Sequence, residues 1–408
     1  MERTILHCDC NSFFASVETA LNPSYKGVPM AVCGSQEDRH GIVLAKNEEA
    51  KKYGIQTAET VYSAKKKCPS LVVAPPHYEE YLRYSKMVNA IYADYTDCIE
   101  PFGIDESWLD VTASRRVFGS GEEIAESIRR RVKEEIGITV SIGVSFNKVF
   151  AKLGSDYRKP DAITVISREN FKQIVHPLPA SNLLFVGRRT EEELLKMGVK
   201  TIGDLAAVSK DMLRHKLGKS GEMLYDYANG LDESPVGGDA DHEVKSISNG
   251  LTFRHDLVTR EDCLIGIDYL CEEIGSKLRK KNLKCTTVSI TVKDTKLKSI
   301  QRQRQLSAPT DLSKEIAELA YKILIDEWRE SVPIRMITVG VSGLVNLGFT
   351  QLDLFEPAEN LSRDKDKKRE ETVDAIRKRF GSSSISSAAY YNTDIGIGPK
   401  KNKDIFKK

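Results

Sequence analysis

Three acidic residues lie where strands of this sequence are expected to end. Asp9 closes the first apolar run of the chain, and Asp105 and Glu106 lie in a tight connection between two apolar stretches, 98–103 and 107–111. If these pieces share one sheet, the three carboxylates meet at one edge of it. Carboxylates so placed repel one another unless divalent cations lie between them, and two Mg²⁺ ions about 3.5–4 Å apart suit phosphoryl or nucleotidyl transfer.

Spacing alone leaves this interpretation open, because Asp105 and Glu106 are as well explained as acids that form a turn. The charge pattern adds a second signal. The first 110 residues hold 11 Lys and Arg against 16 Asp and Glu (−5), whereas residues 277–304 hold 10 basic residues against Asp294 alone (+9). The first region suits metal ions and the second suits a polyanion, although a basic run is most often only a solvated surface.

The elements that must position the acids follow a definite order. Apolar spacing predicts, in turn, a strand at 4–9, a helix at 13–21, strands at 98–103 and 107–111, a helix at 124–136 and a strand at 138–144. This β-α-β-β-α-β order resembles the ferredoxin-like plan. We therefore expect an α+β sheet domain with the three acids on it.

The rest of the chain divides by composition into further units. A Gly- and Pro-punctuated insertion, 23–77, carries a helical stretch at Asn47–Tyr53, and residues 167–235 form short helices with Gly at their ends. After a linker at 235–241, a second α+β unit runs from about 244 to 344. Beyond it we expect an amphipathic helix at 363–380 and a disordered Lys-rich end at 399–408.

Composition excludes several classes of protein. The chain has 408 residues, enough for two to four domains, with 40% hydrophobic and 29% charged residues. It contains no apolar run long enough to span a membrane and no signal-peptide core, so we expect a cytoplasmic protein. Eight cysteines without a CxxC pair or a Cys/His cluster indicate buried reduced thiols rather than zinc or disulfides.

Three ordered motifs resemble those of Y-family translesion DNA polymerases. The first is CDCNSFFASVE at 8–18, the second IDESWLD at 104–110, and the third SFNKVFAKLGSDYRKP at 145–160. The resemblance extends over residues 1–345. It implies a multidomain α+β right-hand fold with a ferredoxin-like palm, small fingers, a helical thumb and an α+β little finger.

The resemblance also implies domain boundaries. The palm would comprise 1–22 and 78–166, the fingers 23–77, the helix-hairpin-helix-like thumb 167–235, the little finger 244–345, and a C-terminal tail 346–408.

The implied activity is template-directed DNA synthesis from dNTPs on a primer-template, error-prone and directed past damaged template. Asp9, Asp105 and Glu106 would be the catalytic carboxylates and, with the backbone carbonyl of Cys10, would bind two Mg²⁺ ions. Phe14 aligns with the steric gate that excludes a ribose 2′-hydroxyl, although its spacing alone favours a core aromatic. The alternative is a clamp-bound accessory factor in induced mutagenesis with weak or no catalysis.

The resemblance assigns basic residues to binding of the triphosphate and of DNA. Lys159 matches the family lysine on the triphosphate, and Lys51 stands where the family has an arginine with the same task. The family's neighbouring tyrosine is replaced by Glu48, which cannot donate a hydrogen bond to phosphate at neutral pH. The candidate contacts to DNA are Lys152, Gly187, Arg188, Arg189, Lys293, Lys298, Arg302 and Arg304.

A short peptide after the last predicted strand resembles the segment by which bacterial replication proteins dock on the sliding clamp. It reads QLDLF at 351–355. Gln351 would bond at the edge of a pocket, and Leu352, Leu354 and Phe355 would supply apolar contact. The expected partners are therefore primer-template DNA, a dNTP and the clamp, with no membrane and with the protein acting as a monomer.

Overall fold

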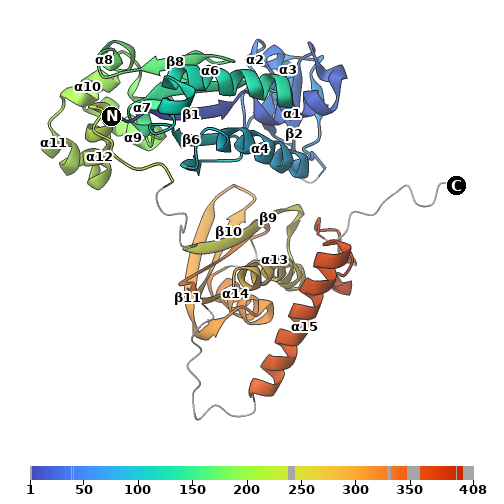
Figure 1. The fold of residues 1–408 in the computed structure, drawn as a ribbon. Coiled ribbons are helices and arrows are strands. Elements are labelled where there is room, and N and C mark those ends of the chain that lie inside the picture. The colour runs from blue at the N-terminus through green and yellow to red at the C-terminus, as the bar shows by residue number, and fades with distance from the viewer. Residues whose placement is uncertain are drawn as a thin grey trace. The chain divides into compact units, whose positions relative to one another are not determined.

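The computed structural model describes residues 2–37, 39, 41–237, 244–328, 332–346, 359–391 and 393–397, without the side chains of 359–362. Two compact units emerge, one formed by 1–34 and 42–241 and the other by 35–41 and 242–408 (Figure 1). Within the described part of the chain, no helix is both long and apolar enough to cross a bilayer.

The first unit is built on a five-stranded sheet in the order β5-β6-β1-β7-β8. Its strands are β1 Ile5–Cys10, β5 Ile99–Pro101, β6 Glu106–Asp110, β7 Val140–Ser145 and β8 Ile163–Ile166. The first four are antiparallel neighbours, and β8 adds in parallel to β7. The predicted ferredoxin-like order is confirmed, with β8 as an addition.

Helices cover both faces of this sheet. They are α1 Phe13–Leu21, α4 Tyr78–Ala93, α5 Arg115–Phe118, α6 Gly121–Arg131 with a wider turn Val132–Ile136, α7 Lys148–Tyr157 and α8 Phe171–Ile174. Leu6 and Cys8 of β1 pack with α1, α4 and α6, whereas Ile5 packs with Ala151 of α7. Side chains alternate along a strand, so His7 and Asp9 share the face that α7 covers.

Glycine lets α7 lie directly on β7. A Cβ on Gly143 would lie 1.8 Å from the Ala151 carbonyl oxygen and 2.5 Å from the Ser155 nitrogen. A Cβ on Gly154 would in turn lie 2.9 Å from the Gly143 Cα. The backbones of strand and helix therefore touch, and this contact sets the height of α7 above Asp9.

Replacement of Gly143 by alanine should destabilise the first unit by about 2–3 kcal/mol, because the added methyl group meets backbone rather than a movable side chain. Urea unfolding followed by circular dichroism measures the change. Gly187→Ala is the matched control, since nothing lies within 4 Å of a Cβ there, and should cost less than about 1 kcal/mol. Equal stability of the two variants would disprove the close-contact argument.

Two smaller parts complete the first unit. One is a sheet ordered β3-β2-β4, with β2 Met30–Cys33, β3 Val43–Lys46, β4 Val72–Ala74, the turn Pro23–Tyr25 and helices α2 Glu48–Lys51 and α3 Val61–Lys67. The other holds the turn Ala180–Asn182 and α9 Arg188–Lys196, α10 Ile202–Ala207, α11 Lys210–Leu217 and α12 Lys219–Ala228. The predicted helical stretch at Asn47–Tyr53 is shorter than expected, because the chain turns at Gly54 with φ +70°.

The second unit repeats the β-α-β-β-α-β order. It consists of β9 Ser246–Leu257, α13 Arg260–Lys280, β10 Leu283–Asp294, β11 Ser299–Thr310, α14 Ser313–Glu327 and β12 Ile334–Ser342, and β13 Val345–Asn346 pairs with β10. The sheet is antiparallel in the order β11-β10-β12-β9. Helices α13 and α14 bury one face of it (Figure 1).

Part of the region predicted as a tail packs on this unit. Helix α15 Glu359–Phe380 and the turn Ala388–Tyr391 follow β13, and Tyr390, Ile395 and Ile397 join the hydrophobic core. The predicted helix at 363–380 is confirmed, but it is attached to the second unit rather than being a separate tail.

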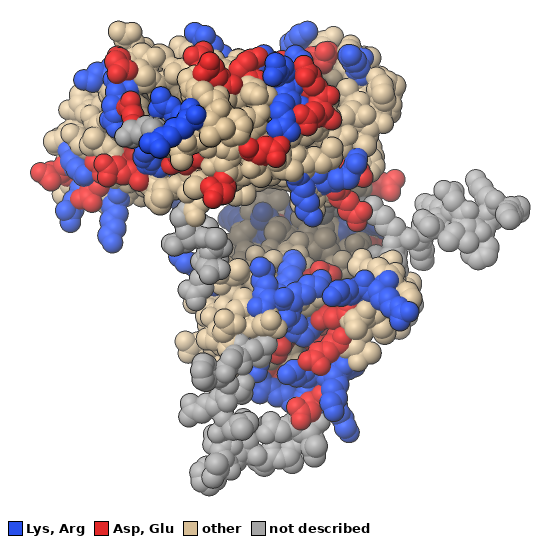
Figure 2. Space-filling model, viewed as in Figure 1, with Lys and Arg blue, Asp and Glu red and all other residues tan. Residues whose placement is uncertain are grey.

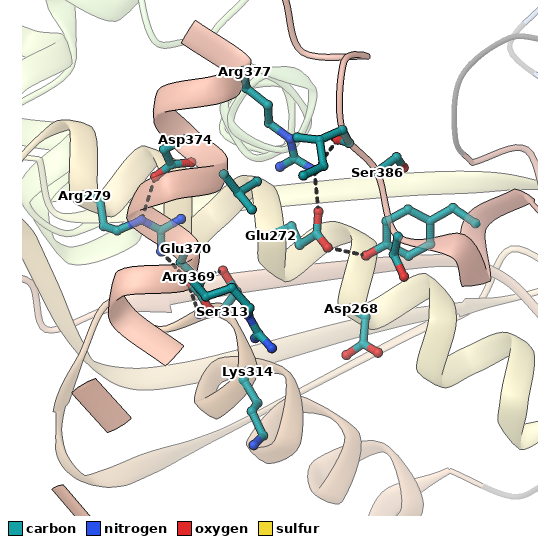
Figure 3. Close-up of a pocket in the computed structure, with 14 residues that line it drawn as sticks. Asp268, Glu272, Arg279, Ser313, Lys314, Arg369, Glu370, Asp374, Arg377 and Ser386 are labelled. Atoms are coloured by element: carbon teal, nitrogen blue, oxygen red, sulfur yellow. Dashed lines mark hydrogen bonds and ion pairs between the residues drawn. The ribbon is translucent and has the colours of Figure 1, made fainter. Parts of the chain in front are cut away.

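Ion pairs attach α15 to α13 and α14 (Figure 3). The Arg279 guanidinium contacts Glu370 and lies 2.7 Å from Asp374, and Arg377 lies 2.9 Å from Glu272. Glu370 also accepts the backbone N–H of Ser313 at 3.0 Å, so it caps the start of α14. The cavity of about 450 Å³ between these helices is lined largely by groups that pair with one another. We therefore interpret it as part of the packing of α15.

Candidate active site

The sheet brings the three predicted catalytic acids together at one end. Asp9 and Glu106 are opposite partners in the antiparallel pair of β1 and β6, so their side chains lie on the same face. The Cys10 backbone N–H donates to the Asp105 carbonyl oxygen at 3.0 Å. The register thus brings Asp9 beside Glu106, and the hydrogen bond from Cys10 holds Asp105, just before β6, next to the same strand end.

Asp9 is buried beside a lysine. Asp9 is 7% exposed, and the Lys159 ammonium lies 2.7 Å from the Asp9 Oδ2. Burial raises the pKa of the Asp9 carboxyl to about 6, although the Lys159 charge acts in the opposite direction. Lys159 also lies 2.6 Å from Asp156. The neighbouring lysine therefore offsets the negative charge of Asp9 only in part.

Glu106 lies under α7. The Lys152 ammonium contacts its carboxylate, and His7 Nε2 lies 3.3 Å from its Oε2. Burial opposes ionisation of Glu106, but His7 and Lys152 together lower its pKa to about 2. The His7 ring is itself fixed by a 2.7 Å contact between Nδ1 and the Ser155 hydroxyl. Lys152, predicted as a DNA contact, is thus paired with Glu106, a predicted catalytic acid.

Asp105 is the acid with no basic partner on its side chain among the described residues. Burial and then the negative charge of Glu106 raise its pKa. Within that part of the chain no three acidic, His or Cys side chains form a ready metal-binding group. Lysines instead contact Asp9 and Glu106.

Divalent cations nevertheless fit this donor set. Three carboxylates and a peptide carbonyl are oxygen ligands, the type that Mg²⁺ prefers. Burial raises the pKa of both the buried Asp9 and the half-buried Asp105, and among the described residues Asp105 has no basic partner within ion-pair distance. Cations placed there would supply the missing charge.

Asp9 and Asp105 open onto a cavity of about 400 Å³. Its lining comes from the end of β1 and the start of α1, from β3, and from the loop before β6. The lining residues are Asp9, Cys10, Asn11, Ser12, Phe13, Phe14, Leu44, Ala45, Lys46, Lys51, Thr57, Ile104, Asp105 and Lys159. The structure therefore gathers the predicted gate and two predicted triphosphate lysines around two of the acids.

Phe14 is held in place by a stack of aromatic rings. Its ring lies 4.1 Å from that of Tyr81, with 11° between the planes. The Tyr81 hydroxyl donates to Glu18, whose carboxylate is also 2.9 Å from His77 Nδ1. Phe14 is consequently a rigid wall of the cavity and not an interior core residue.

Asn11, a polar residue that the sequence did not single out, fixes the loop that carries Lys159. Asn11 Oδ1 accepts the backbone N–H of Asp161 at 2.8 Å, and Asn11 Nδ2 donates to Ser141 at 2.8 Å. The loop after α7 is thereby tied to the end of β1. Asn11 lies inside the first motif, so proximity to Asp9 was the signal that could have found it. His7 was detectable too, because it precedes Asp9 by two and shares its face.

The departure from the family pattern at Glu48 has a clear local structure. Lys51 Nζ lies 2.5 Å from Glu48 Oε1, which also accepts from the Ser12 hydroxyl at 3.2 Å. Lys51 lines the cavity, but its charge is paired. Lys46, one position before Asn47, lines the same cavity, and the motif carries no signal for it because the family's Tyr and Arg occupy positions after Asn47.

The thumb candidates lie at a helix start. Gly187 is the N-cap of α9, and Arg188 and Arg189 are its first two residues, all exposed. Among the described residues neither arginine has an ion-pair partner. Phe185, where the motif commonly has Gly, adopts φ +68° and is 59% exposed. Free N–H groups of a helix start and two unpaired arginines suit phosphate.

The little-finger candidates divide between two faces of the second sheet. Arg302 and Arg304 pair with Ile290 and Val288 in register, so they lie on the face that the helices cover. There Arg302 lies 3.0 Å from Glu327, and Arg304 lies 2.6 Å from Asp326.

The open face carries mostly uncharged polar side chains. On the edge strand β11 and its neighbour β10 they are Thr287, Ser289, Thr291, Gln301, Gln303 and Gln305, with Lys293 as the basic exception. Lys298 lies in the turn before β11. On the face of this unit drawn in Figure 2, acidic and basic side chains lie next to one another. The basic run is thus only partly available to a polyanion.

The predicted clamp-binding residues Gln351, Leu352, Leu354 and Phe355 lie outside the described residues, between β13 and α15.

Comparisons with known proteins agree with the fold and with the motifs. Family models match over most of the chain: the impB/mucB/samB family at 8–156, its C-terminal domain at 244–354, and the DNA polymerase-iota thumb domain at 182–232. A solved Y-family DNA polymerase chimera of Dbh and Dpo4 matches with a TM-score of 0.74 and 24% identity, covering 84% of this chain and 99% of its own.

Full-length relatives carry one name. DNA polymerase IV of Acetivibrio thermocellus is 49% identical over 97% of this chain and 98% of its own length. DNA polymerase IV of Clostridium kluyveri is 36% identical over 95% and 98%, and DNA polymerase IV 1 of Bacillus subtilis is 33% identical over 99% and 97%. With this coverage, the chain belongs to the impB/mucB/samB family of Y-family DNA polymerases, whose members similar to it are named DNA polymerase IV.

Proposed function

We propose that this chain is a DNA-directed DNA polymerase that extends a primer by two-metal nucleotidyl transfer at Asp9, Asp105 and Glu106, and that it copies past damaged template. The observation that carries the proposal is the register that sets Asp9 opposite Glu106, with Asp105 bonded to the next residue of β1. The relatives named DNA polymerase IV support the same activity.

The residues around the cavity would divide the work. Asp9, Asp105, Glu106 and the Cys10 carbonyl would hold two Mg²⁺ ions, which would acidify the primer 3′-hydroxyl and stabilise charge on the leaving pyrophosphate. Lys159 lies where phosphates placed over Asp9 come within reach of its ammonium. The ring of Phe14 would exclude a 2′-hydroxyl from the sugar position.

The remaining parts would hold the primer-template. We infer a palm at 1–22 and 78–166, fingers at 23–77, a thumb at 167–235 and a little finger at 244–345. Gly187, Arg188 and Arg189 are the best placed DNA contacts, because they are exposed at a helix start and unpaired among the described residues. Lys293 on the open sheet face is better placed than Arg302 and Arg304, which are paired with acids.

A primer-extension assay with Mg²⁺ and four dNTPs tests the proposal. The protein should extend an annealed primer, should pass at least one damaged template base, and should stop when the metal is chelated. Absence of extension on undamaged template would favour the alternative of a non-catalytic accessory factor. That alternative is not favoured, because the chain retains all three carboxylates and its relatives over nearly the whole length are named DNA polymerase IV.

We further propose that the peptide 351–355 docks on the sliding clamp and that the protein acts as a monomer in the cytoplasm. The support for a monomer is that one chain supplies every group of the active-site cavity. The support for docking is the sequence QLDLF, which follows the last strand of the second unit.

Deletion of Gln351–Phe355 should remove the stimulation of synthesis by the clamp and leave basal synthesis intact, because the peptide is remote in sequence from the active site. Primer extension with and without loaded clamp measures the effect. Substitution of Asp353 alone by asparagine is the control, since its carboxylate is not one of the docking side chains. Undiminished stimulation of the deletion variant would refute the docking role.

A further inference from the structure

Lys46 ends a strand that forms one wall of the active-site cavity. It is the last residue of β3, and the two residues before it, Leu44 and Ala45, line the same cavity. β3 is anchored by its pairing with β2, where Lys46 is the partner of Ala31. The strand therefore delivers this ammonium to the cavity that holds Asp9, Phe14 and Lys159.

The other lysines of the cavity are paired with acids. Lys159 lies 2.7 Å from Asp9 and 2.6 Å from Asp156, and Lys51 lies 2.5 Å from Glu48. Lys46, by contrast, has no carboxylate within ion-pair distance among the described residues. Its Nζ donates to the hydroxyl of Thr57 at 3.0 Å, and a neutral oxygen leaves the charge uncompensated.

The surroundings make this charge unfavourable in the absence of an anion. Burial and then the positive charge of Lys51 lower the pKa of Lys46, and the more distant Glu59 and Glu48 offset this in part. A half-buried ammonium next to a second lysine gains most from a ligand that carries several negative charges. A polyphosphate in the cavity is such a ligand.

From this geometry we propose that Lys46 is a triphosphate-binding residue of this polymerase and supplies the phosphate contact that Glu48 does not. The proposal rests on the proposed function of the cavity. Glu48 accepts hydrogen bonds and neutralises Lys51, so the loop at 47–52 retains little positive charge for phosphate. Lys46 restores that charge one residue before the loop, on a strand rather than on the helix α2.

Single-turnover incorporation of one dNTP into a saturating primer-template tests the proposal. Lys46→Met should raise the dissociation constant of the incoming dNTP about 10- to 100-fold, because a hydrogen bond to a charged group is lost. The maximal incorporation rate should fall by a smaller factor. Lys46→Arg should recover most of the affinity.

Lys52→Met is the matched control. It removes the same charge from the same segment, but Lys52 is exposed at the end of α2 and does not line the cavity. Its dNTP affinity should stay within about 2-fold of that of the wild type. If Lys46→Met and Lys52→Met behave alike, the proposal is wrong. It is also wrong if Lys46→Met weakens binding of the primer-template instead of the dNTP, because Lys46 would then contact DNA phosphates.

Binding of inorganic tripolyphosphate to the protein without DNA, measured by calorimetry, separates this proposal from the proposed function. Lys46→Met should weaken this binding by a factor similar to that for dNTP, while thermal denaturation confirms that the variant is folded. If the wild-type protein binds tripolyphosphate through Lys46 but extends no primer, the proposed polymerase function is wrong and the role of Lys46 in phosphate binding stands. Equal tripolyphosphate binding by wild type and Lys46→Met would overturn the role of Lys46.

Discussion

The double variant Asp105→Ala, Glu106→Ala should lose primer extension by about 10⁴-fold or more, equal to about 5.5 kcal/mol of added barrier. Asp105 and Glu106 supply two of the three carboxylates at the end of β1 and β6, and Asp9 alone leaves too few oxygen ligands for two divalent cations. Single-nucleotide incorporation under single-turnover conditions measures the loss, because it separates chemistry from DNA release.

The loss of extension can be assigned to these acids only if the double variant still folds and still binds DNA. Glu134→Gln, on the exposed surface after α6, removes a charge without touching the site and should extend primers like the wild type. The double variant should bind primer-template with nearly unchanged affinity, since the thumb and little finger carry the candidate phosphate contacts. Extension by the double variant at the wild-type rate would remove these acids from the catalytic role.

Strand alternation explains why the face that carries Asp9 and Glu106 was predictable from the sequence. Asp9 ends an apolar run, and the second motif places Glu106 at the start of a strand, so only the pairing of two short strands was needed to bring them together. The motifs distinguished a catalytic role for these acids from a role in a turn, which spacing alone left open. The lysines on these acids were not predictable in the same way, because Lys152 reaches Glu106 only through the packing of α7 on Gly143.

The basic run of the second unit shows the limit of charge counting. Ile300, Arg302, Arg304 and Leu306 alternate with glutamines along β11, so the two arginines share a face with apolar residues that pack on the core. That alternation was readable in the sequence. Their acidic partners on α14 were not, because Asp326 and Glu327 are brought near only by the packing of the helix on the sheet.

The packing of α15 was unpredictable for a related reason. Its spacing predicted an amphipathic helix, but its attachment uses a capping carboxylate and ion pairs from Arg279 and Arg377 rather than a broad apolar stripe. Such contacts leave no periodic signal in a sequence. One consequence is that the segment 347–358, which includes the candidate clamp peptide, is bounded on both sides by elements of the second unit, β13 and α15.

Replacement of Phe14 by alanine should reduce the preference for dNTP over rNTP by roughly 100-fold, because the cavity wall at the sugar position would be removed. The Phe14 ring is held in place by neighbouring side chains. Phe14 stacks on Tyr81 at 4.1 Å, and Tyr81 is fixed by its hydrogen bond to the buried Glu18. A ring so held cannot swing aside for a 2′-hydroxyl, so exclusion should depend on its presence rather than on its motion.

The ratio of kcat/KM for dCTP and CTP opposite the same template guanine measures this selection. Tyr81→Phe is the informative control, since it keeps the ring under Phe14 and removes only the hydroxyl that bonds Glu18. Tyr81→Phe should retain most of the selection of dCTP over CTP, whereas Phe14→Ala should lose it. In Phe14→Ala, dNTP incorporation should fall far less than in the double variant Asp105→Ala, Glu106→Ala. Unchanged sugar selection in Phe14→Ala would make Phe14 a structural aromatic and would assign the exclusion to another wall of the cavity. Ser12 and Phe13 are the next candidates, because they line the same cavity.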